Sequence, residues 1–263
     1  KAREEKGDTS PEKKRVTLLN ETPLRTHENQ EPVCEEINPE YCQTKIVEVD
    51  PVLLRKNKVV SLFHDNKMHD QMKILRTQVL NKMEARQGRS LLVTSAHPGE
   101  GKTLTAVNLA VSVSHEVNQT VLFVDADLKT PSVHQFFGLD ARRGLTDFLL
   151  RQAEIPELLL NPGIEKLVLL PAGTRVPNSA ELLGSPRMDS VINEMKTRYP
   201  DRLIILDGPP LLTCADSLII SQFIDGILLV VEAEKTPIKS IEKAMELLYE
   251  KPLLGTVLNK DRE

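Results

Sequence analysis

Seven consecutive residues, Pro98-Gly-Glu-Gly-Lys-Thr-Leu104, combine glycines, a lysine and a hydroxyl in a way that suits the binding of nucleotide phosphates. The two glycines can adopt backbone angles closed to other residues, so consecutive amide N–H groups can converge on phosphate oxygens at the start of a helix. Lys102 would place a positive charge on the β- and γ-phosphates, and the Thr103 hydroxyl would ligate the Mg²⁺ that bridges them. We therefore expect a nucleotide site formed by Pro98, Gly99, Glu100, Gly101, Lys102, Thr103 and Leu104.

This loop is a variant of the usual phosphate-binding pattern, which has a glycine six residues before the lysine. Ala96 stands at that position here. A Gly-Lys-Thr tripeptide also occurs by chance in many turns, so the motif alone does not establish a site. The context favours phosphate binding, because an apolar run that begins at Ser90 precedes the loop and a helical pattern begins near Lys102.

Aspartates follow two other apolar runs where each predicted strand ends. Asp125 and Asp127 close the run that begins at Val121, and Asp207 closes the run that begins at Leu203. Ligands of open α/β sheets bind outside the carboxyl ends of the strands. These carboxylates and the glycine loop can therefore share one crevice.

Carboxylates held close together need a cation, and Mg²⁺ suits them because it takes one or two carboxylates together with nucleotide phosphate. We expect Thr103, Asp125, Asp127 and Asp207 to serve the metal, and Lys102, Asp125 and Asp127 to serve catalysis. Asp125 could face the nucleophile while Asp127 orders metal-bound water, because the two lie on opposite sides of an extended chain. The alternative is that each aspartate only caps the following helix.

The elements that must position these residues alternate in type. Apolar runs of strand length are separated by amphipathic segments of helix length, which predicts a mostly parallel β-sheet with helices on both faces, as in P-loop NTPases. The predicted strands are Ser90–Thr94, Val121–Asp125, Leu167–Pro171, Leu203–Asp207, Gly226–Val231 and Leu253–Leu258. The predicted helices are Asp65–Met83, Lys102–His115, Pro186–Arg198, Ser217–Phe223 and Ile238–Tyr249.

The N-terminal quarter of the chain has a different composition. Residues 1–60 are polar and rich in Glu, Lys and Pro, so we predict a flexible tail or linker there and one P-loop ATPase domain at 61–263. Within the tail, Ile46 to Leu54 is apolar enough to dock onto the domain.

Charge and hydropathy exclude several classes of function. The net charge of −4 gives no broad positive field, which argues against nucleic acid as a partner. No apolar run approaches the roughly 18 residues that span a bilayer, and the start lacks a signal-peptide layout. Three cysteines without metal or redox spacing suit a reducing compartment. We expect a cytoplasmic protein without direct membrane insertion.

Four segments resemble motifs of one family. The glycine loop, Asp125-Ala-Asp-Leu-Lys129 and Asp207-Gly-Pro-Pro210 resemble the three Walker-type motifs of bacterial tyrosine kinases (BY-kinases). The fourth segment is similar to a stretch of the same family that other P-loop ATPases generally lack. It is Leu170-Pro-Ala-Gly-Thr-Arg-Val-Pro-Asn-Ser-Ala-Glu-Leu-Leu183. The resemblance covers about Met68 to Lys260.

The resemblance implies an ATP- and Mg²⁺-dependent protein-tyrosine autokinase that regulates exopolysaccharide or capsular polysaccharide synthesis and export. In that family the kinase works with a membrane-spanning polysaccharide chain-length or co-polymerase protein, which implies a location at the inner face of the plasma membrane. Subunits of the family assemble through a charged helix, and the aligned residues here are Asp70, Lys73 and Arg76. These keep the charge signs but not the bidentate geometry of arginine. Asn259 could meet the adenine, although Asn after a strand is more often a turn residue.

The family's cluster of acceptor tyrosines near the C-terminus has no counterpart here. The sequence contains Tyr41, Tyr199 and Tyr249, of which only Tyr41 falls in the predicted tail. Two alternatives to an autokinase therefore stay open. One is a nucleotide-gated switch of the partition or cell-division-site type, which the absence of a second lysine at Ala96-His-Pro98 disfavours. The other is a regulatory ATPase or nucleotide sensor that partners a co-polymerase without tyrosine autophosphorylation.

Overall fold

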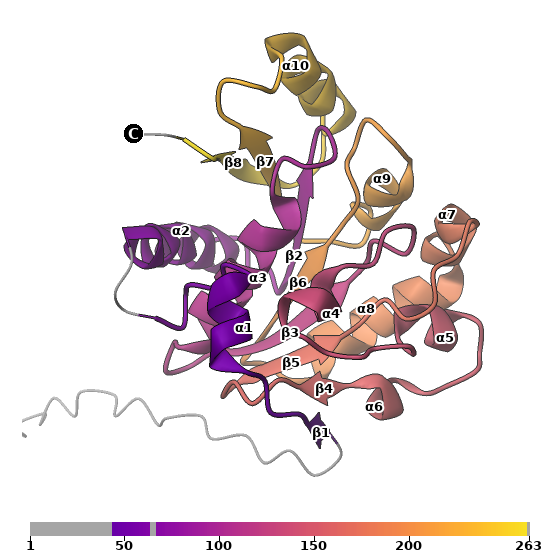
Figure 1. Cartoon of the computed structure of the whole chain (residues 1–263). Helices are drawn as coiled ribbons and strands as arrows, with labels where there is room; N and C mark the ends of the chain where they lie inside the picture. Colours follow the sequence, from indigo (N-terminus) through magenta and orange to yellow (C-terminus); the bar gives the residue numbers. More distant parts are fainter. Residues whose placement is uncertain (1–43, 64–66, 262–263) are drawn as a thin grey trace, which may run out of the picture. The chain divides into compact units, whose positions relative to one another are not determined.

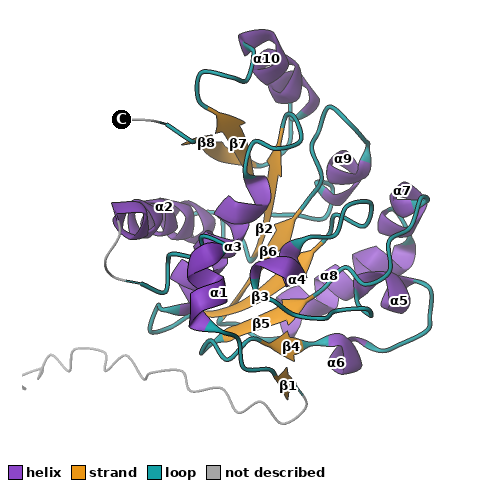
Figure 2. Cartoon of the chain, viewed as in Figure 1, coloured by secondary structure: helices purple, strands orange, loops and turns teal. Residues whose placement is uncertain are grey.

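A mostly parallel sheet lies at the centre of the computed structural model, which describes residues 44–63 and 67–261 (Figures 1 and 2). Within these residues, which all belong to one unit, eight strands pair in the order β1-β4-β5-β3-β6-β2-β7-β8. The strands are β1 Lys45–Ile46, β2 Ser90–Ser95, β3 Thr120–Asp125, β4 Leu160–Asn161, β5 Leu167–Leu170, β6 Arg202–Asp207, β7 Gly226–Glu232 and β8 Leu253–Asn259. The pairing is parallel throughout except between β4 and β5. The predicted fold class is confirmed.

Ten helices connect or cover the strands within the described residues. They are α1 Pro51–Lys56, α2 Lys67–Glu84, α3 Lys102–Ser114, α4 Val133–Phe136, α5 Leu145–Leu149, α6 Ile155–Leu158, α7 Ser179–Leu183, α8 Pro186–Arg198, α9 Asp216–Ile220 and α10 Ile238–Leu247. Parallel neighbours need such crossovers, because a tight hairpin can only join antiparallel strands.

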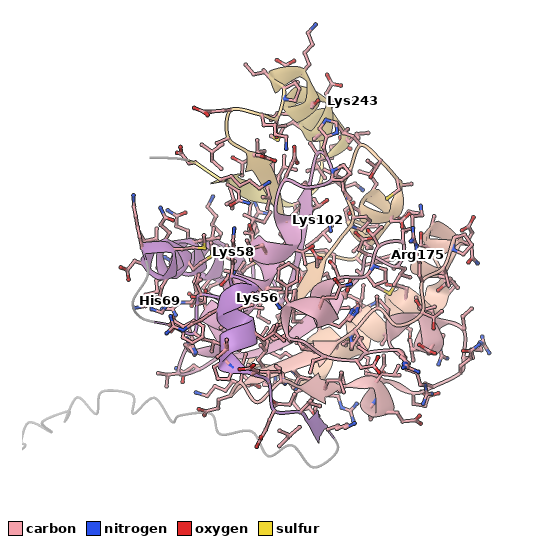
Figure 3. All side chains as sticks on the ribbon, in the orientation of Figure 1. Lys56, Lys58, His69, Lys102, Arg175 and Lys243 are labelled. Atoms are coloured by element: carbon pink, nitrogen blue, oxygen red, sulfur yellow. The ribbon has the colours of Figure 1, made fainter. Side chains whose placement is uncertain are left out.

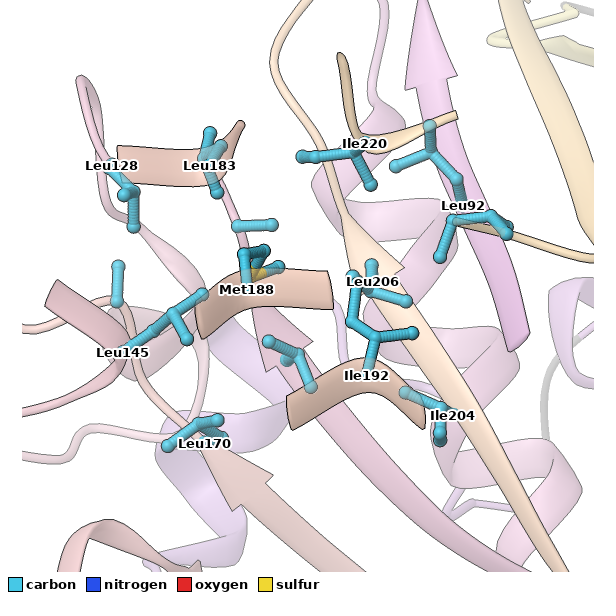
Figure 4. Packing of buried hydrophobic residues seen from close by; sticks show 14 of the residues in the cluster. Leu92, Leu128, Leu145, Leu170, Leu183, Met188, Ile192, Ile204, Leu206 and Ile220 are labelled. Atoms are coloured by element: carbon cyan, nitrogen blue, oxygen red, sulfur yellow. The ribbon is translucent and has the colours of Figure 1, made fainter. Parts of the chain in front are cut away.

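One face of the sheet packs against α5 to α9 and part of α10. Strand residues of one parity, including Leu92 and Leu206, meet Leu183, Met188 and Ile192 from the helices in a continuous apolar cluster (Figure 4). The helix α8 is well specified locally, because its Ser185 cap is followed by a proline and its last turn carries basic residues. This face therefore has the usual packing of an α/β layer.

The opposite face packs against α1 to α4. Residues of the other parity, such as Leu91 and Ile205, contact α3, whose residues are almost all buried. The two faces of each central strand are thus both apolar, as expected for a buried parallel sheet.

The segment before α2 docks onto this second face. Leu54 of α1 is 3% exposed and belongs to its apolar cluster. The buried Asn108 of α3 accepts hydrogen bonds from the amides of Val60 and Ser61, at 2.8 and 3.1 Å, and donates one to the Lys58 carbonyl at 2.9 Å. Structured residues therefore continue on the N-terminal side of the expected 60/61 boundary. The functional division into 1–60 and 61–263 stays a prediction, and residues 1–43 lie outside the described ranges.

The long elements agree with the sequence-based expectations, and several short ones were missed. Each of the six predicted strands is present within one residue at either end, and the helix expected from Asp65 is described from Lys67. The two-residue strands β1 and β4 and the short helices α1, α4, α5, α6 and α7 were not predicted, because patterns this short carry no clear period. The short helix α9 was predicted, as Ser217–Phe223, and the structure has it at Asp216–Ile220. No helix among the described residues is long and apolar enough to cross a membrane.

Candidate functional site

The glycine loop joins β2 to α3 at the carboxyl edge of the sheet, as its sequence context predicted. Gly99 and Gly101 have φ angles of 84° and 93°, in the left-handed region that favours glycine. A Cβ on Gly101 would overlap with Nδ2 of Asn259. Gly101 also forms the N-cap of α3 without a side-chain hydrogen bond, so the first amides of a 13-residue helix are open to an anion.

Residues at the end of β8 and in the segment after β7 contact this loop and hold its shape. The Glu100 carboxylate is buried and accepts hydrogen bonds from the His97 amide, at 3.0 Å, and from the Thr236 hydroxyl, at 2.5 Å. Asn259 Nδ2 donates to the Glu100 carbonyl at 2.8 Å, and Lys260 Nζ donates to the Gly99 carbonyl at 2.6 Å. Glu100 and Asn259 were expected to bind the nucleotide. Both hold the shape of the loop, and nucleotide binding by Glu100 and an adenine contact of Asn259 stay predictions.

Lys102, Thr103, Asp127 and Asp207 converge at this edge. Lys102 Nζ lies 3.1 Å from Asp127 Oδ2 and 3.6 Å from Asp207 Oδ2, and the Thr103 hydroxyl donates to Asp207 Oδ2 at 2.6 Å. The sheet order explains the meeting, because β6 lies between β3 and β2 and pairs Asp207 with Asp125 on one side and Val93 on the other. Figure 3 shows Lys102 at the start of α3, beside the sheet.

Asp125 is fully buried next to this cluster. Its Oδ2 accepts hydrogen bonds from the amides of Ser132 and Val133, both at 3.0 Å, and its Oδ1 accepts one from the Asp127 amide at 3.2 Å. Burial and the charge of Asp207 raise the pKa of Asp125 to about 7, against the opposing effect of the two loop amides. Asp125 therefore holds the loop after β3 in place, and its catalytic role stays a prediction.

The buried charges balance one another only in part. Burial lowers the pKa of Lys102, but the nearby carboxylates of Asp207, Asp127 and Asp125 outweigh burial, so its pKa is raised and it remains an ammonium. Burial raises the pKa of Asp207, although Lys102 and the Thr103 hydroxyl oppose the shift. One lysine thus faces a group of three carboxyl groups, which favours a further cation or a bound proton.

The arrangement fits Mg²⁺ bound together with a nucleotide. Asp207 Oδ1 is buried and has no hydrogen-bond partner among the described residues, so it is an acceptor that a bound ligand could satisfy. No group of three or more His, Cys, Asp or Glu side chains in the described part of the chain is arranged to hold a metal by itself. Mg²⁺ needs no such group, because phosphate oxygens and water supply most of its ligands.

The sequence reasoning missed the residues that support the aspartates. Both the amide and the hydroxyl of Thr130 donate to Asp127 Oδ1 at 2.9 Å, which fixes that carboxylate. Asp216 is fully buried, accepts a 2.6 Å hydrogen bond from the Ser179 hydroxyl and lies 3.4 Å from Lys129 Nζ. The motifs that include Lys129 and Ser179 were noted in the sequence, but nothing in them indicated this partner.

The charged helix expected at a subunit interface is α2. Lys73 lies 4.0 Å from Asp70, and both side chains are well exposed. Arg76 instead forms a 2.6 Å ion pair with Glu116 and donates to the Ser112 carbonyl at 2.9 Å. Arg76 is therefore engaged within its own chain, and only the first two of the three residues are presented to solvent.

The fold and the site together define a P-loop NTPase, in which a glycine loop follows one central strand and aspartates end its neighbours. The family profile of ParA proteins, described as NUBPL iron-transfer P-loop NTPase, matches residues 86–261. The chain belongs to this family, whose members bind nucleotides through the P-loop.

Individual relatives show which group of P-loop NTPases this chain belongs to. Tyrosine-protein kinase YwqD of Bacillus subtilis is 35% identical over 216 residues, which span 78% of this chain and 90% of that protein. Tyrosine-protein kinase CpsD of Streptococcus agalactiae is 28% identical over 200 residues, which span 75% of this chain and 85% of that protein. The crystal structure of the chimerical protein CapA2B2 matches with a TM-score of 0.72 and 26% identity, and covers 83% of this chain and 94% of that one. The chain therefore belongs to the bacterial tyrosine-protein kinases, which favours a kinase over the partition-type switch.

Proposed function

We propose that this chain transfers the terminal phosphoryl group of MgATP to a tyrosine hydroxyl. The observation that carries the proposal is the convergence of Lys102, Thr103, Asp127 and Asp207, with a buried Asp207 oxygen that has no hydrogen-bond partner among the described residues. Phosphoryl transfer needs little covalent chemistry from a protein, because positioning and charge neutralisation supply most of the rate. A site of this composition supplies both.

Each residue has a distinct role in this proposal. The amides of the glycine loop and the first turn of α3 bind the phosphates, and Lys102 moves from the aspartates to the phosphate oxygens. Thr103 and Asp207 hold the metal side of the nucleotide, with Asp127 and Asp125 nearby. When bound, Mg²⁺ neutralises the charge that develops on the transferred group.

A carboxylate accepts the proton of the tyrosine hydroxyl. Asp125, whose pKa is raised to about 7 by burial and by Asp207, suits a base that works near neutral pH. Asp127 is the alternative, because it lies against Lys102 and is fixed by Thr130. Replacing each by asparagine and comparing the pH dependence of kcat/KM assigns the proton to one of them.

We further propose that the kinase regulates exopolysaccharide or capsular polysaccharide synthesis with a membrane-spanning co-polymerase partner. The kinship with tyrosine-protein kinases supports this role, and the partner would hold the kinase at the inner face of the membrane. Subunit assembly through α2 would use the exposed Asp70 and Lys73, since Arg76 is held by Glu116. Analytical ultracentrifugation of the wild type and an Asp70→Lys variant tests that assembly.

One assay separates the possible activities. The purified protein is incubated with MgATP, and phosphate release and phosphotyrosine are measured for the wild type, Lys102→Met and Lys243→Met. Lys243 is an exposed lysine on α10, so its change is a matched control. Phosphotyrosine that is lost only in Lys102→Met supports a kinase. Phosphate release without phosphotyrosine would instead support a switch, and neither signal would support a sensor.

A further inference from the structure

Two adjoining cavities open beside the aspartates. One has a volume of about 490 Å³ and is lined in part by Thr130, His134, Arg142 and Arg175. The other, of about 360 Å³, is lined by Lys129, Arg175 and the two residues that follow it. Arg175 lines both, so it stands where they adjoin. Neither cavity is lined by a residue of the glycine loop.

Hydrogen bonds tie the walls of these cavities to the catalytic edge. Thr130 donates twice to Asp127, so a wall residue touches the predicted catalytic carboxylate. The amide of Val176 donates to the Leu128 carbonyl at 3.1 Å, which attaches the residue after Arg175 to the residue after Asp127. Arg175 is therefore carried by a loop with a set position relative to the aspartates.

The walls carry one uncompensated positive charge. Lys129 is paired with the buried Asp216, and Arg142 lies 3.2 Å from Asp140. Burial lowers the pKa of His134, against the opposing charge of Asp140, so its ring is neutral near pH 7. Arg175 is exposed and makes no hydrogen bond or ion pair with any described residue.

Figure 3 shows how this arginine is placed. Arg175 lies on the side of the molecule near α7, and Lys243 lies on α10, well apart from it. Lys243 has the same sign of charge and is also exposed. It therefore provides a matched position for controls outside the two cavities.

We propose that Arg175 binds an acidic residue next to the acceptor tyrosine, so that the kinase prefers tyrosines flanked by glutamate. The inference rests on the proposed kinase function and adds its substrate class. A glutamate that occupies the cavities would leave its neighbouring tyrosine directed toward Asp127 and the nucleotide. Arginine is suited to this contact because its fork matches a carboxylate with two hydrogen bonds.

The chain's own tyrosines provide the charge complement. Glu40 directly precedes Tyr41, and Glu250 directly follows Tyr249, whereas Tyr199 lies between an arginine and a proline. Segment 35–45 also carries two further glutamates before its tyrosine. We take the Tyr41 segment of a second copy as the occupant, since its glutamates supply the counter-charge that Arg175 lacks among residues 44–63 and 67–261.

The experiment uses a peptide of residues 35–45 with Cys42→Ser, and a second peptide that also carries Glu40→Lys. Phosphorylation of both is measured at low ionic strength with the wild type, Arg175→Glu and Lys243→Glu. Binding of fluorescein-labelled peptides is followed by anisotropy with the same proteins. The wild type should prefer the Glu40 peptide, and Arg175→Glu should lower kcat/KM for it by about tenfold, mostly through KM. The same variant should favour the Glu40→Lys peptide, and Lys243→Glu should behave like the wild type.

Several results would overturn the inference. Peptide preference that is the same in the wild type and Arg175→Glu excludes Arg175 as the reader of the acidic residue. A raised KM for MgATP with every peptide assigns the arginine to the nucleotide instead. If the wild type forms phosphotyrosine on itself with MgATP but phosphorylates neither peptide, the inferred substrate class is wrong and the kinase proposal stands. If it forms no phosphotyrosine at all, the kinase proposal fails, and the anisotropy data still decide whether the cavities bind an acidic peptide. Arg175→Ala, with about half the effect, replaces the glutamate variant if that variant does not fold.

Discussion

Replacing Lys102 with methionine should destabilise the nucleotide-free protein as well as remove its activity. The Lys102 side chain is 12% exposed, and its carboxylate partners Asp127 and Asp207 are 2% and 0% exposed. At an effective dielectric constant of about 20, the two contacts of 3.1 and 3.6 Å correspond to roughly 5 kcal/mol each before desolvation. Desolvation of the ammonium offsets much of this attraction. Removing one partner of such a buried pair typically costs about 3 kcal/mol.

The stability that Lys102→Met loses should be larger at high pH than at low pH. The pKa of Lys102 is raised by the carboxylates, so its stabilising effect is fully present below the ordinary lysine pKa of 10.5 and is lost only above it. The pKa of Asp125 is raised from 3.8 to about 7, so between these values the folded state binds more protons than the unfolded state, and stability falls as pH rises. At pH 8 Asp125 is mostly ionised, whereas at pH 6 it is mostly neutral. Lys102→Met should therefore cost more at pH 8.

Thermal unfolding in the presence of a chelator measures this effect. For a protein of this size, 3 kcal/mol corresponds to a fall in Tm of about 6–12 °C at pH 8, with a smaller fall at pH 6. Lys243→Met changes an exposed lysine in the same way and should shift Tm by no more than about 2 °C. A Lys102→Met variant as stable as the wild type at pH 8, or one that loses more stability at pH 6, would refute the reasoning.

Three other substitutions test separate parts of the structure. Gly101→Ala should weaken MgATP binding by about tenfold in calorimetry, because its φ of 93° and the overlap with Asn259 strain the loop, and wild-type affinity would contradict this. Ser179→Ala should lower the free energy of unfolding in urea by about 1–3 kcal/mol, because the buried Asp216 loses a hydrogen bond; an unchanged urea midpoint would rule this out. Leu54→Ala should cost about 2–4 kcal/mol if α1 is part of the folded domain, and an effect below about 0.5 kcal/mol would show that α1 contributes little to stability.

The central strands could be predicted because their signal is local. Runs such as Leu203 to Asp207 are continuously apolar, since both faces of a parallel sheet are buried, and this pattern needs no knowledge of the partner strand. The strands β1 and β4 have only two residues each and exist only through pairing with each other and with β5. No pattern within two residues can predict a partner more than a hundred positions away.

The candidate site also has a part that the sequence predicts and a part that it does not. The types of Lys102, Thr103 and Asp207 and their positions after apolar runs indicate phosphate and metal chemistry from the sequence alone. The restraints on them were not predictable, because the amides that hold Asp125 and the carbonyl that Asn259 contacts depend on how two loops fold against each other. The same holds for the exposed position of Arg175 beside the cavities.

The sequence by itself determined the kind of elements, their order and which reactive side chains stand at strand ends, because these follow from local periodicity and backbone sterics. The tertiary structure alone decided that β6 lies between β2 and β3, and thereby that Asp207 meets both Lys102 and Asp125. The reason is physical: strand order comes from burying both faces of the sheet at once, and that burial depends on residues distributed over the whole chain.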